Sequence, residues 1–311
     1  MNIVFCGTPK FAVPALRALV ENSFEVRLVV SQPDRPAGRG LTTVPTPVKQ
    51  AAAEFNLPVI QPAKIKSNPE FRAQLEQLQP DAIVVVAYGR IIPQWMLDLP
   101  RFGNINVHAS LLPKYRGAAP IQWAIARGET VTGVTTMRLD AGLDTGDMLL
   151  QRELPILPED TAETLAPKLA ELGGPLLIET LCGLESSVVL PMQQDASQAT
   201  LAPILTKEDG RIDWNRTCVE TWNRLRGFTP WPGAFVTFRG KNLNIWRAVP
   251  AASGTEPLAP SQLHAQGEHL YAGCGENTVL EILELQVEGK KRMSAKDFVN
   301  GYRPKPGETL A

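Results

Sequence analysis

Cysteine is scarce in this 311-residue chain, and the positions of the four cysteines exclude two kinds of site. Cys6, Cys182, Cys218 and Cys274 show neither the CxxC spacing of a zinc site nor the density of a disulfide-stapled domain. We therefore expect reduced thiols in a cytoplasmic protein. No apolar run approaches the length of a membrane helix, and a strand expected from Ile3 leaves no room for a signal peptide.

The chain also lacks an excess of charge of either sign. It has 31 basic and 32 acidic side chains, so its net charge of −1 gives no basic field that would by itself indicate a nucleic-acid partner. A hydrophobic content of 44% is ordinary for a globular protein. At this length the chain exceeds one typical core, which predicts two domains.

The order of expected elements places the domain boundaries. Residues 1–184 alternate strands with helices, which predicts an α/β domain with a Rossmann-like, open and mostly parallel sheet. Residues 185–205 contain prolines and polar residues and are expected to form an inter-domain linker. Residues 206–311 hold short β runs separated by Gly, Pro and Asn, which predicts a small β-barrel.

The first strand and the turn after it argue against a dinucleotide site. Ile3–Cys6 is expected to be a buried strand, and Thr8 is expected to cap the helix that follows. The turn Gly7-Thr8-Pro9 is not the G-x-G-x-x-G motif and has no second glycine for a pyrophosphate to approach. The expected fold is therefore compatible with a dehydrogenase, but the residues of this turn do not support a dinucleotide-binding site.

A polar pair occurs on a strand expected within the stretch Asn104–Pro120. Ile105 and Val107 alternate with Asn106 and His108, so the amide and the imidazole lie on one face. Such a pair can direct hydrogen bonds at one oxygen atom, as acyl transfer requires when a carbonyl becomes tetrahedral. A histidine bonded to a backbone carbonyl and a turn-capping asparagine would give the same pattern.

An acidic, glycine-rich loop follows the strand expected at residues 133–138. Asp140, Asp144 and Asp147 lie among Gly142 and Gly146, beyond the end of that strand. One of these carboxylates near a histidine would favour the imidazolium and hold a water for proton transfer. The loop could alternatively form turns or bind calcium, although it lacks the alternating spacing and closing Glu of an EF-hand.

Together these stretches resemble the formyltransferase family that uses 10-formyltetrahydrofolate. The signature is an Asn-x-His strand followed by Ser-Leu-Leu-Pro and a downstream Asp, here Asn106, His108, the run from Ser110 to Pro113, and Asp144. The opening MNIVFCGTPKFAVPALRAL, the loop QPDRPAGRG and the segments PKYRGAAPIQWAI, RIDWN and FTPWPGAF resemble those members that formylate initiator methionyl-tRNA. Ala109 is one small departure, where glycine is equally expected.

The resemblance implies roles for further residues. Asn106, His108 and Asp144 would be catalytic, with no metal. The residues implied in folate binding lie in two turns: Ser110, Leu111, Leu112 and Pro113, and Gly89, Arg90, Ile91 and Ile92. The second domain would be an OB-like barrel along tRNA. The cations implied in tRNA contact are Arg35, Arg39, Lys114, Arg116, Lys290 and Lys291. The loop of residues 32–46 would reach toward the acceptor stem, and a monomer is expected.

The shared catalytic trio does not by itself choose the acceptor. Sugar-nucleotide and glycinamide-ribonucleotide formyltransferases can share it, and a formyltetrahydrofolate hydrolase is conceivable. A long arginine-bearing loop and a second domain favour tRNA, because small acceptors need neither. A catalytically inert tRNA-binding protein would leave the Asn-x-His strand unexplained.

Overall fold

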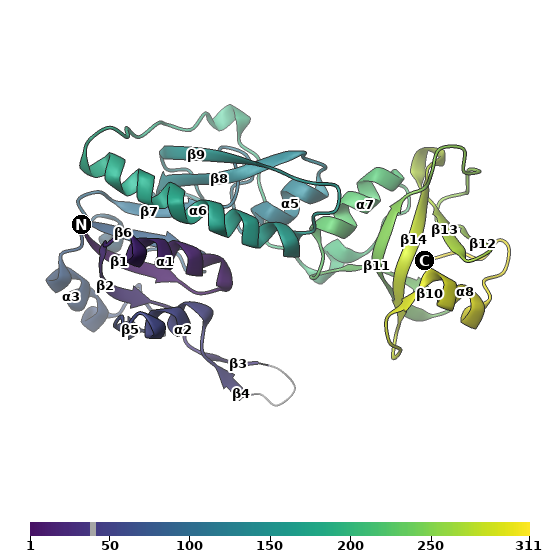
Figure 1. Cartoon of the computed structure of the whole chain (residues 1–311), viewed down its shortest axis with the longest axis horizontal. Coiled ribbons are helices and arrows are strands. Elements are labelled where there is room, and N and C mark those ends of the chain that lie inside the picture. Colours follow the sequence, from purple (N-terminus) through teal and green to yellow (C-terminus); the bar gives the residue numbers. More distant parts are fainter. Residues whose placement is uncertain (38–41) are drawn as a thin grey trace. The chain divides into compact units, whose positions relative to one another are not determined.

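The computed structural model describes residues 1–37 and 42–311, which divide into two compact units (Figure 1). Unit 1 consists of Met1–Pro120, Val131–Pro155 and Ala166–Ala202. Unit 2 consists of Ile121–Thr130, Ile156–Leu165 and Pro203–Ala311. Each unit has its own sheet, and the candidate catalytic residues all belong to unit 1.

Unit 1 is built on a seven-stranded sheet in the order β5-β2-β1-β6-β7-β8-β9. The strands are β1 (Asn2–Gly7), β2 (Glu25–Val30), β5 (Val59–Ile60), β6 (Ala82–Val86), β7 (Asn104–His108), β8 (Val131–Arg138) and β9 (Met148–Pro155). The first five run parallel to their neighbours, whereas β8 is antiparallel to β7 and β9 is antiparallel to β8. The prediction of a Rossmann-like, mostly parallel sheet is therefore confirmed.

Helices cover both faces of this sheet. They are α1 (Val13–Glu21), α2 (Pro47–Glu54), α3 (Pro69–Leu78), α4 (Gln94–Leu97) and α6 (Ala162–Glu185), of which α6 begins within unit 2. On one face, Phe71 of α3 and Met96 of α4 pack against Val4 and Ile83. On the other face α6 approaches β7 closely, because a Cβ at Gly173 would lie 2.8 Å from Val107. Burial on both faces explains why β6 is apolar throughout.

The turn after β1 corrects one expectation. A 3-10 turn at Lys10–Ala12 precedes α1, and Thr8 caps neither element. Its hydroxyl instead donates to the carbonyl of Tyr88 at 3.1 Å, at the end of the neighbouring strand β6. The capping prediction was wrong because the competing acceptor lies 80 residues away in the sequence.

Part of the 32–46 stretch, expected to be a loop, forms a hairpin of β3 (Arg35–Ala37) and β4 (Thr42–Val44). Asp34 fixes its base by accepting from Lys49 Nζ and Gln61 Nε2, both at 2.6 Å. These hydrogen bonds, led by the one from Lys49, hold the Asp34 pKa below its usual value. Arg39 lies outside the described residues.

Unit 2 is built on an antiparallel sheet in the order β10-β11-β14-β13-β12, with β15 also paired to β14. The strands are β10 (Ala234–Phe238), β11 (Lys241–Pro250), β12 (Leu263–Gln266), β13 (His269–Gly273), β14 (Val279–Val287) and β15 (Met293–Ser294). The accompanying helices are α5 (Pro120–Ala126), α7 (Cys218–Gly227) and α8 (Ala295–Tyr302). Phe238 and Phe298 meet in its core at a ring-centroid distance of 5.2 Å.

Residues 308–311 connect the two outer strands of this sheet. Leu263 of β12 donates its backbone N–H to the Glu308 carbonyl at 2.7 Å, and Ala311 exchanges two backbone hydrogen bonds with Thr237 of β10. Within residues 1–37 and 42–311, no direct pairing joins β10 to β12. The predicted second, β-rich domain is confirmed as an antiparallel sheet. In the part of the chain that the structure describes, the predicted barrel is not closed by strand pairing, because the two outer strands are linked through residues 308–311 instead.

No helix in the described part of the chain combines the length and the apolar character needed to cross a membrane.

Candidate active site

Strand β7 places Asn106 and His108 at the carboxyl end of the central sheet. Both residues are buried, with 8% and 6% of their surface exposed. Asn106 pairs with Val85 of β6 on one side and with Met137 of β8 on the other, so its backbone is fixed in the sheet. The alternation of β7 then puts the amide and the imidazole on one face, as predicted.

The imidazole of His108 lies between a backbone carbonyl and a carboxylate. Its Nε2 is 2.9 Å from the Tyr115 carbonyl oxygen, which can only accept, so Nε2 carries the proton of that hydrogen bond. Its Nδ1 lies 3.9 Å from Asp144 Oδ2. That separation suits an ion pair once the ring is protonated and is too long for a direct hydrogen bond.

Asp144 reaches His108 from the loop between β8 and β9. Its backbone adopts φ = 52°, a left-handed conformation that costs free energy for a residue other than glycine. The same Oδ2 that faces the imidazole accepts a hydrogen bond from the Gly117 N–H at 2.8 Å. The structure therefore brings His108 and Asp144 together, although they lie 36 positions apart in the sequence.

Two asparagines of β7 differ in their partners. Asn104 donates to the carbonyls of Met96 and Leu97, at 2.8 and 3.2 Å, and so serves the fold. The side-chain amide of Asn106, by contrast, has no hydrogen-bond partner among residues 1–37 and 42–311. A buried amide without a protein partner can donate to a ligand oxygen.

The run Ser110-Leu111-Leu112-Pro113 is held by side chains of β8 and β9. Thr135 Oγ1 donates to the Ser110 carbonyl at 2.7 Å and accepts from the Leu112 N–H at 3.1 Å. Gln151 Nε2 donates to the Leu112 carbonyl at 2.7 Å. Ser110 Oγ itself donates to the Lys114 carbonyl at 2.7 Å. Thr135 and Gln151 thus hold the backbone of this run, and the run in turn holds the loop beside His108 in place.

The second turn predicted to bind folate follows β6. Gly89 adopts φ = 76°, and its carbonyl accepts from Gln32 Nε2 at 3.2 Å. Among the residues that the structure describes, the backbone N–H groups of Arg90, Ile91 and Ile92 have no partner. The Ile91 side chain is 91% exposed. Open backbone donors beside an exposed apolar side chain fit a flat, polar-edged ring such as a pterin.

The predicted tRNA contacts occupy different environments. Arg35 is exposed on β3 and donates to Gln32 Oε1 at 3.2 Å, and Lys114 is exposed in the loop after β7. Lys290 and Lys291 are exposed between β14 and β15. Arg116, implied in tRNA contact by the resemblance, is only 9% exposed. Its Nε and one terminal nitrogen donate to Gln194 Oε1 at 3.0 and 2.8 Å.

Sequence reasoning missed Gln194 and Thr200. Both lie in the segment expected to be a linker, which in the structure contacts unit 1 as far as Ala202. Gln194 Nε2 donates to the carbonyls of Asp144 and Gly146, at 2.9 and 2.7 Å. Thr200 Oγ1 accepts from the Tyr115 N–H at 2.9 Å. No motif in the sequence marks either residue.

The cysteine thiols take no part in this arrangement. Burial raises the pKa of the Cys274 thiol to about 12 and raises that of Cys6 well above its ordinary value, so both stay protonated at neutral pH. Residues 1–37 and 42–311 contain no cluster of three or more His, Cys, Asp or Glu that could hold a metal ion.

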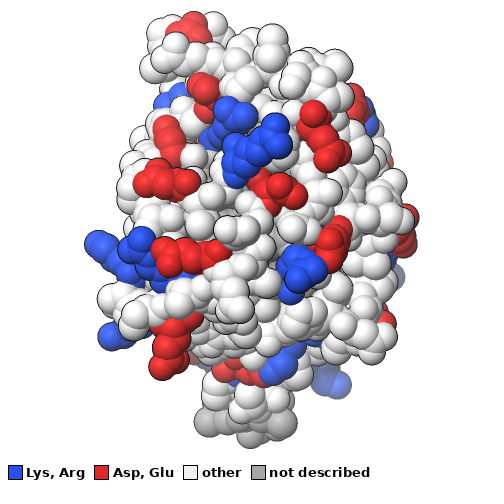
Figure 2. All heavy atoms as spheres, turned by 90° about the vertical axis from the view of Figure 1, so that its left-hand side faces the viewer, with Lys and Arg blue, Asp and Glu red and all other residues white. Residues whose placement is uncertain are grey.

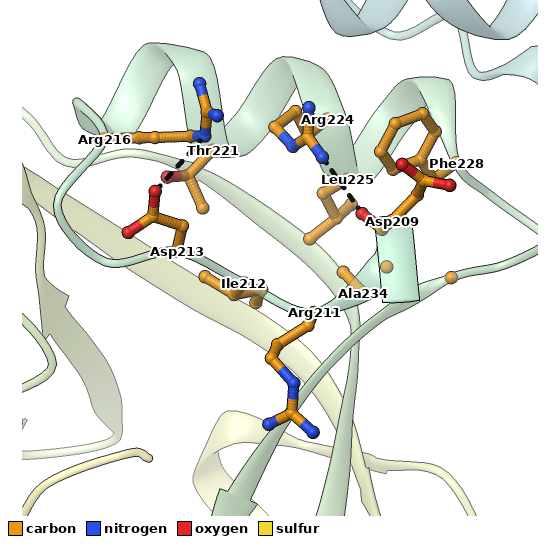
Figure 3. Close-up of a pocket in the computed structure, with 12 residues that line it drawn as sticks. Asp209, Arg211, Ile212, Asp213, Arg216, Thr221, Arg224, Leu225, Phe228 and Ala234 are labelled. Atoms are coloured by element: carbon orange, nitrogen blue, oxygen red, sulfur yellow. Dashed lines mark hydrogen bonds and ion pairs between the residues drawn. The ribbon is translucent and has the colours of Figure 1, made fainter. Parts of the chain in front are cut away.

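Unit 2 contains a narrow cleft, lined by residues between Asp209 and Ala234, that holds none of the predicted site residues (Figure 3). Two arginines along it have partners within the cleft: Arg216 Nε lies 3.7 Å from Asp213 Oδ2, and Arg224 donates to the backbone carbonyl of Asp209 at 3.1 Å. Burial lowers the Arg224 pKa, and the neighbouring positive charge of Arg216 lowers it further.

On the face shown in Figure 2, basic and acidic side chains are interspersed. Among the described residues drawn there, neither sign forms a large continuous patch. This mixture agrees with the net charge of −1.

Comparisons with known proteins give the relationship directly. Residues 1–181 match the formyl transferase family, and residues 204–303 match the formyl transferase C-terminal domain. The methionyl-tRNA formyltransferase of Koribacter versatilis is 64% identical over 310 residues, which cover 100% of this chain and 98% of the relative.

Solved structures agree on the fold. An N-formyltransferase from Helicobacter canadensis, in complex with folinic acid and dTDP-3-aminofucose, superposes with a TM-score of 0.68 at 18% identity, covering 90% of this chain and 98% of that one. Methionyl-tRNA formyltransferase from Clostridium thermocellum gives 0.56 at 20% identity, covering 82% and 95%. Given the family match and the full-length similarity at 64% identity, the chain belongs to the formyltransferase family, within the group of the methionyl-tRNA formyltransferases.

Proposed function

We propose that this protein transfers a formyl group from 10-formyltetrahydrofolate to the α-amino group of methionine on initiator methionyl-tRNA, in support of translation initiation. One observation supports this more than any other: the buried Asn106 amide, without a protein partner, shares a strand face with a histidine that lies 3.9 Å from a carboxylate. That arrangement occurs in a chain 64% identical over its length to a protein named for this reaction.

The reaction needs an oxyanion site and a proton acceptor. The methionine amine attacks the formyl carbon, and the carbonyl oxygen becomes negative as the new C–N bond forms. Asn106 donates its amide N–H to that oxygen. His108 uses Nε2–H for the Tyr115 carbonyl, so the proton that the positive ring can donate to the reacting groups is the one on Nδ1, the nitrogen that lies 3.9 Å from Asp144 Oδ2. No protein nucleophile is required.

Proton transfer completes the balance of atoms. The attacking amine becomes positive and loses one proton, which Asp144 receives through a water molecule. The C–N bond to N10 of the folate then breaks, and N10 takes up a proton, so the products are formylmethionyl-tRNA and tetrahydrofolate. A negative Asp144 beside His108 also stabilises the positive ring during this sequence.

The folate site extends over the turn at residues 89–92 and the run at residues 110–113. The N–H groups of Arg90, Ile91 and Ile92 offer donors to the ring edge, and Ile91 offers apolar surface. The run 110–113 borders His108 and keeps the donor's formyl group beside it.

For tRNA, the supporting feature is the exposure of cations on short connections. Arg35 and Lys114 in unit 1, and Lys290 and Lys291 in unit 2, are exposed, and in this proposal they contact backbone phosphates. Arg39, which lies outside the described residues, is also proposed to contact tRNA. Arg116 was predicted to do the same, but its buried contacts with Gln194 favour a role inside unit 1.

The proposal also includes the domain boundaries of the protein and its cellular compartment. Residues 1–184 form the catalytic domain, 185–205 the connection and 206–311 the tRNA-binding domain. Family matches that end at residue 181 and resume at residue 204 support this division. We also propose a cytoplasmic protein, because its substrate is used in translation, and we propose that it acts as a monomer.

An acceptor panel with radiolabelled formyl donor tests the proposal. Charged initiator tRNA, charged elongator tRNA, free methionine and an amino sugar nucleotide are supplied in parallel, and label in each product is measured. We expect transfer to charged initiator tRNA above all others. Preferential labelling of the sugar nucleotide would replace tRNA with a small acceptor, and release of formate in every tube would indicate a hydrolase.

A further inference from the structure

Residues 192–202 contact both loops that carry the partners of His108. Met192 exchanges two backbone hydrogen bonds with Met148, at 2.9 and 2.8 Å, where β9 begins. Further along, Ala202 N–H donates to the Arg116 carbonyl at 2.7 Å, and Arg116 N–H donates to the Thr200 carbonyl at 2.8 Å. The segment is thus held at both ends against unit 1, rather than spanning freely to unit 2.

Thr200 acts on the side of the imidazole that carries Nε2. Its Oγ1 accepts from the Tyr115 N–H at 2.9 Å, while the Tyr115 carbonyl accepts from His108 Nε2 at the same distance. Thr200 therefore fixes the residue whose carbonyl sets the orientation and tautomer of the catalytic ring.

Gln194 acts on the opposite side, where Nδ1 faces Asp144. Its Oε1 accepts two hydrogen bonds from the buried Arg116 guanidinium, and its Nε2 donates to the carbonyls of Asp144 and Gly146. All four hydrogen-bonding positions of the amide are used, and the side chain is only 7% exposed. Replacement by an apolar residue would leave the guanidinium and both carbonyls unsatisfied.

The two residues that face His108 share an unfavourable backbone conformation. Tyr115 has φ = 62° and Asp144 has φ = 52°, both in the left-handed region. Residues in that region persist when surrounding contacts hold them there, and they are common at active sites. Here those contacts come from Thr200 for Tyr115 and from Gln194 for Asp144.

We propose that Gln194 and Thr200 are positioning residues for catalysis, which keep Asp144 and the Tyr115 carbonyl in place on the two sides of His108. This inference rests on the proposed formyl transfer for its kinetic consequence, but its structural consequence can be measured without substrate. Neither residue touches the reacting atoms. Their effect is on the orientation of His108 and Asp144, and therefore on turnover more than on substrate binding.

Gln194→Leu removes all four hydrogen bonds, and Gln198→Leu is the matched control. Gln198 lies in the same segment and is exposed, and its side chain bonds to no described residue other than Asp195, whose Oδ2 is 2.9 Å from Gln198 Nε2. A displacement of about 1 Å in a catalytic group can cost on the order of 100-fold in rate, so we expect kcat of Gln194→Leu to fall by 10- to 100-fold. KM for folate and for tRNA should change less than threefold, and Gln198→Leu should match wild type.

Thr200→Val is the second variant, because it keeps the side-chain volume and the Thr200 backbone bonds. It removes the acceptor for Tyr115 N–H alone, so folding should be unaffected. We expect a smaller fall in kcat, about fivefold to tenfold, because only one part-buried hydrogen bond is lost. Wild-type kcat in both Gln194→Leu and Thr200→Val would overturn the proposal.

Histidine-selective NMR supplies the readout that is independent of substrate. The chain has three histidines, and His264 and His269 lie in unit 2, where they report whether a variant is folded. In Gln194→Leu and Thr200→Val we expect the His108 ring resonances to shift while those of His264 and His269 stay. An unmoved His108 signal would overturn the proposal even where activity falls. Failure of the wild type to formylate tRNA would instead count against the proposed function.

Discussion

The polar side chains of the active site and the charged side chains of unit 2 differ in burial and in their partners. In unit 1, Asn106 and His108 are buried, and the Asn106 amide has no partner among the described residues. In unit 2, pairs such as Arg239 with Glu308 and Lys296 with Glu268 lie at the surface, and the cation of each pair is about half exposed.

This difference sets the scale of what single substitutions can do. A buried donor without a protein partner acts in a low-dielectric site, where one hydrogen bond to a developing charge has a large effect on rate. A surface cation facing phosphate contributes one of many weak, salt-screened contacts. We therefore expect large effects from few residues in unit 1 and small effects spread over many in unit 2.

The largest effect is expected from Asn106→Ala and His108→Ala. Loss of one oxyanion donor typically costs about 100- to 1,000-fold in rate, so each variant should lose most turnover in a steady-state formylation assay. Asn104→Ala is the matched control on the same strand. Since Asn104 bonds to Met96 and Leu97, we expect it to lower thermal stability and leave kcat of the folded protein unchanged.

A fully active His108→Ala protein would contradict the expectation that single substitutions have large effects in unit 1. An Asn104→Ala protein that is stable but inactive would contradict it too, because Asn104 would then share the function assigned to Asn106.

Asp144→Asn should have the next largest effect. The amide keeps an oxygen that can accept from Gly117 N–H, but it removes the negative charge 3.9 Å from His108 Nδ1 and the proton acceptor. We expect kcat to fall about 100-fold, the lower range for loss of a general base. Asp140→Asn makes the same change in the same loop. Among the described residues its carboxylate bonds only within that loop, to Gly142 N–H and Thr145 Oγ1, so near wild-type turnover is expected.

Equal losses in Asp140→Asn and Asp144→Asn, measured in the same assay, would show that the loop responds to any lost charge rather than to the one beside the histidine.

The part of the site that follows from local pattern could be predicted from the sequence. Strand alternation alone puts Asn106 and His108 on one face, and the continuous apolar run of β6 indicates a strand buried on both faces. Asp144 could be connected to His108 only through the resemblance to a family, because nothing local specifies which carboxylate of the loop turns inward. The left-handed φ of Asp144 is a consequence of tertiary contacts.

The segment at residues 192–202 shows what could not be predicted. Its contacts join Gln194 to Arg116 across 78 positions and Thr200 to Tyr115 across 85. Composition there is polar and proline-containing, which is typical of a linker, and no periodicity reveals the buried glutamine. The capping prediction for Thr8 failed for the same reason, since its acceptor belongs to another strand.

A smaller effect is expected from Lys290→Ala and Lys291→Ala in unit 2. Both lysines are exposed, and loss of one phosphate contact should raise KM for tRNA a few-fold and reduce the slope of log affinity against log salt by about 1. Lys296→Ala is the control, because that cation pairs with Glu268 at 2.5 Å. A salt slope unchanged in both variants would place the tRNA contact of unit 2 elsewhere.

The smallest effect, on stability alone, is expected from Glu308→Gln. Hydrogen bonds from Arg239 hold the Glu308 pKa below its ordinary value. A folded-state pKa below the unfolded one means that the carboxylate stabilises the fold above the ordinary glutamate pKa, and that this contribution is lost as the pH falls through the lowered value. Thermal denaturation should therefore show Glu308→Gln below wild type at pH 7, with the gap closing in acid.

Glu256→Gln controls for the loss of one negative charge, since Glu256 is exposed in the same unit and has no ion-pair partner among the described residues. It should denature with wild type at every pH. The backbone of residues 308–311 joins the two outer strands of the unit 2 sheet, so Glu308→Gln should act on the stability of unit 2. We therefore expect its tRNA affinity to fall only under conditions where unit 2 begins to unfold. A difference in denaturation temperature between Glu308→Gln and wild type that stays constant from pH 7 into acid would mean that the stabilisation comes from packing rather than from the charge. The contribution of Glu308 would then resemble that of the buried residues of unit 1 rather than that of a surface ion pair.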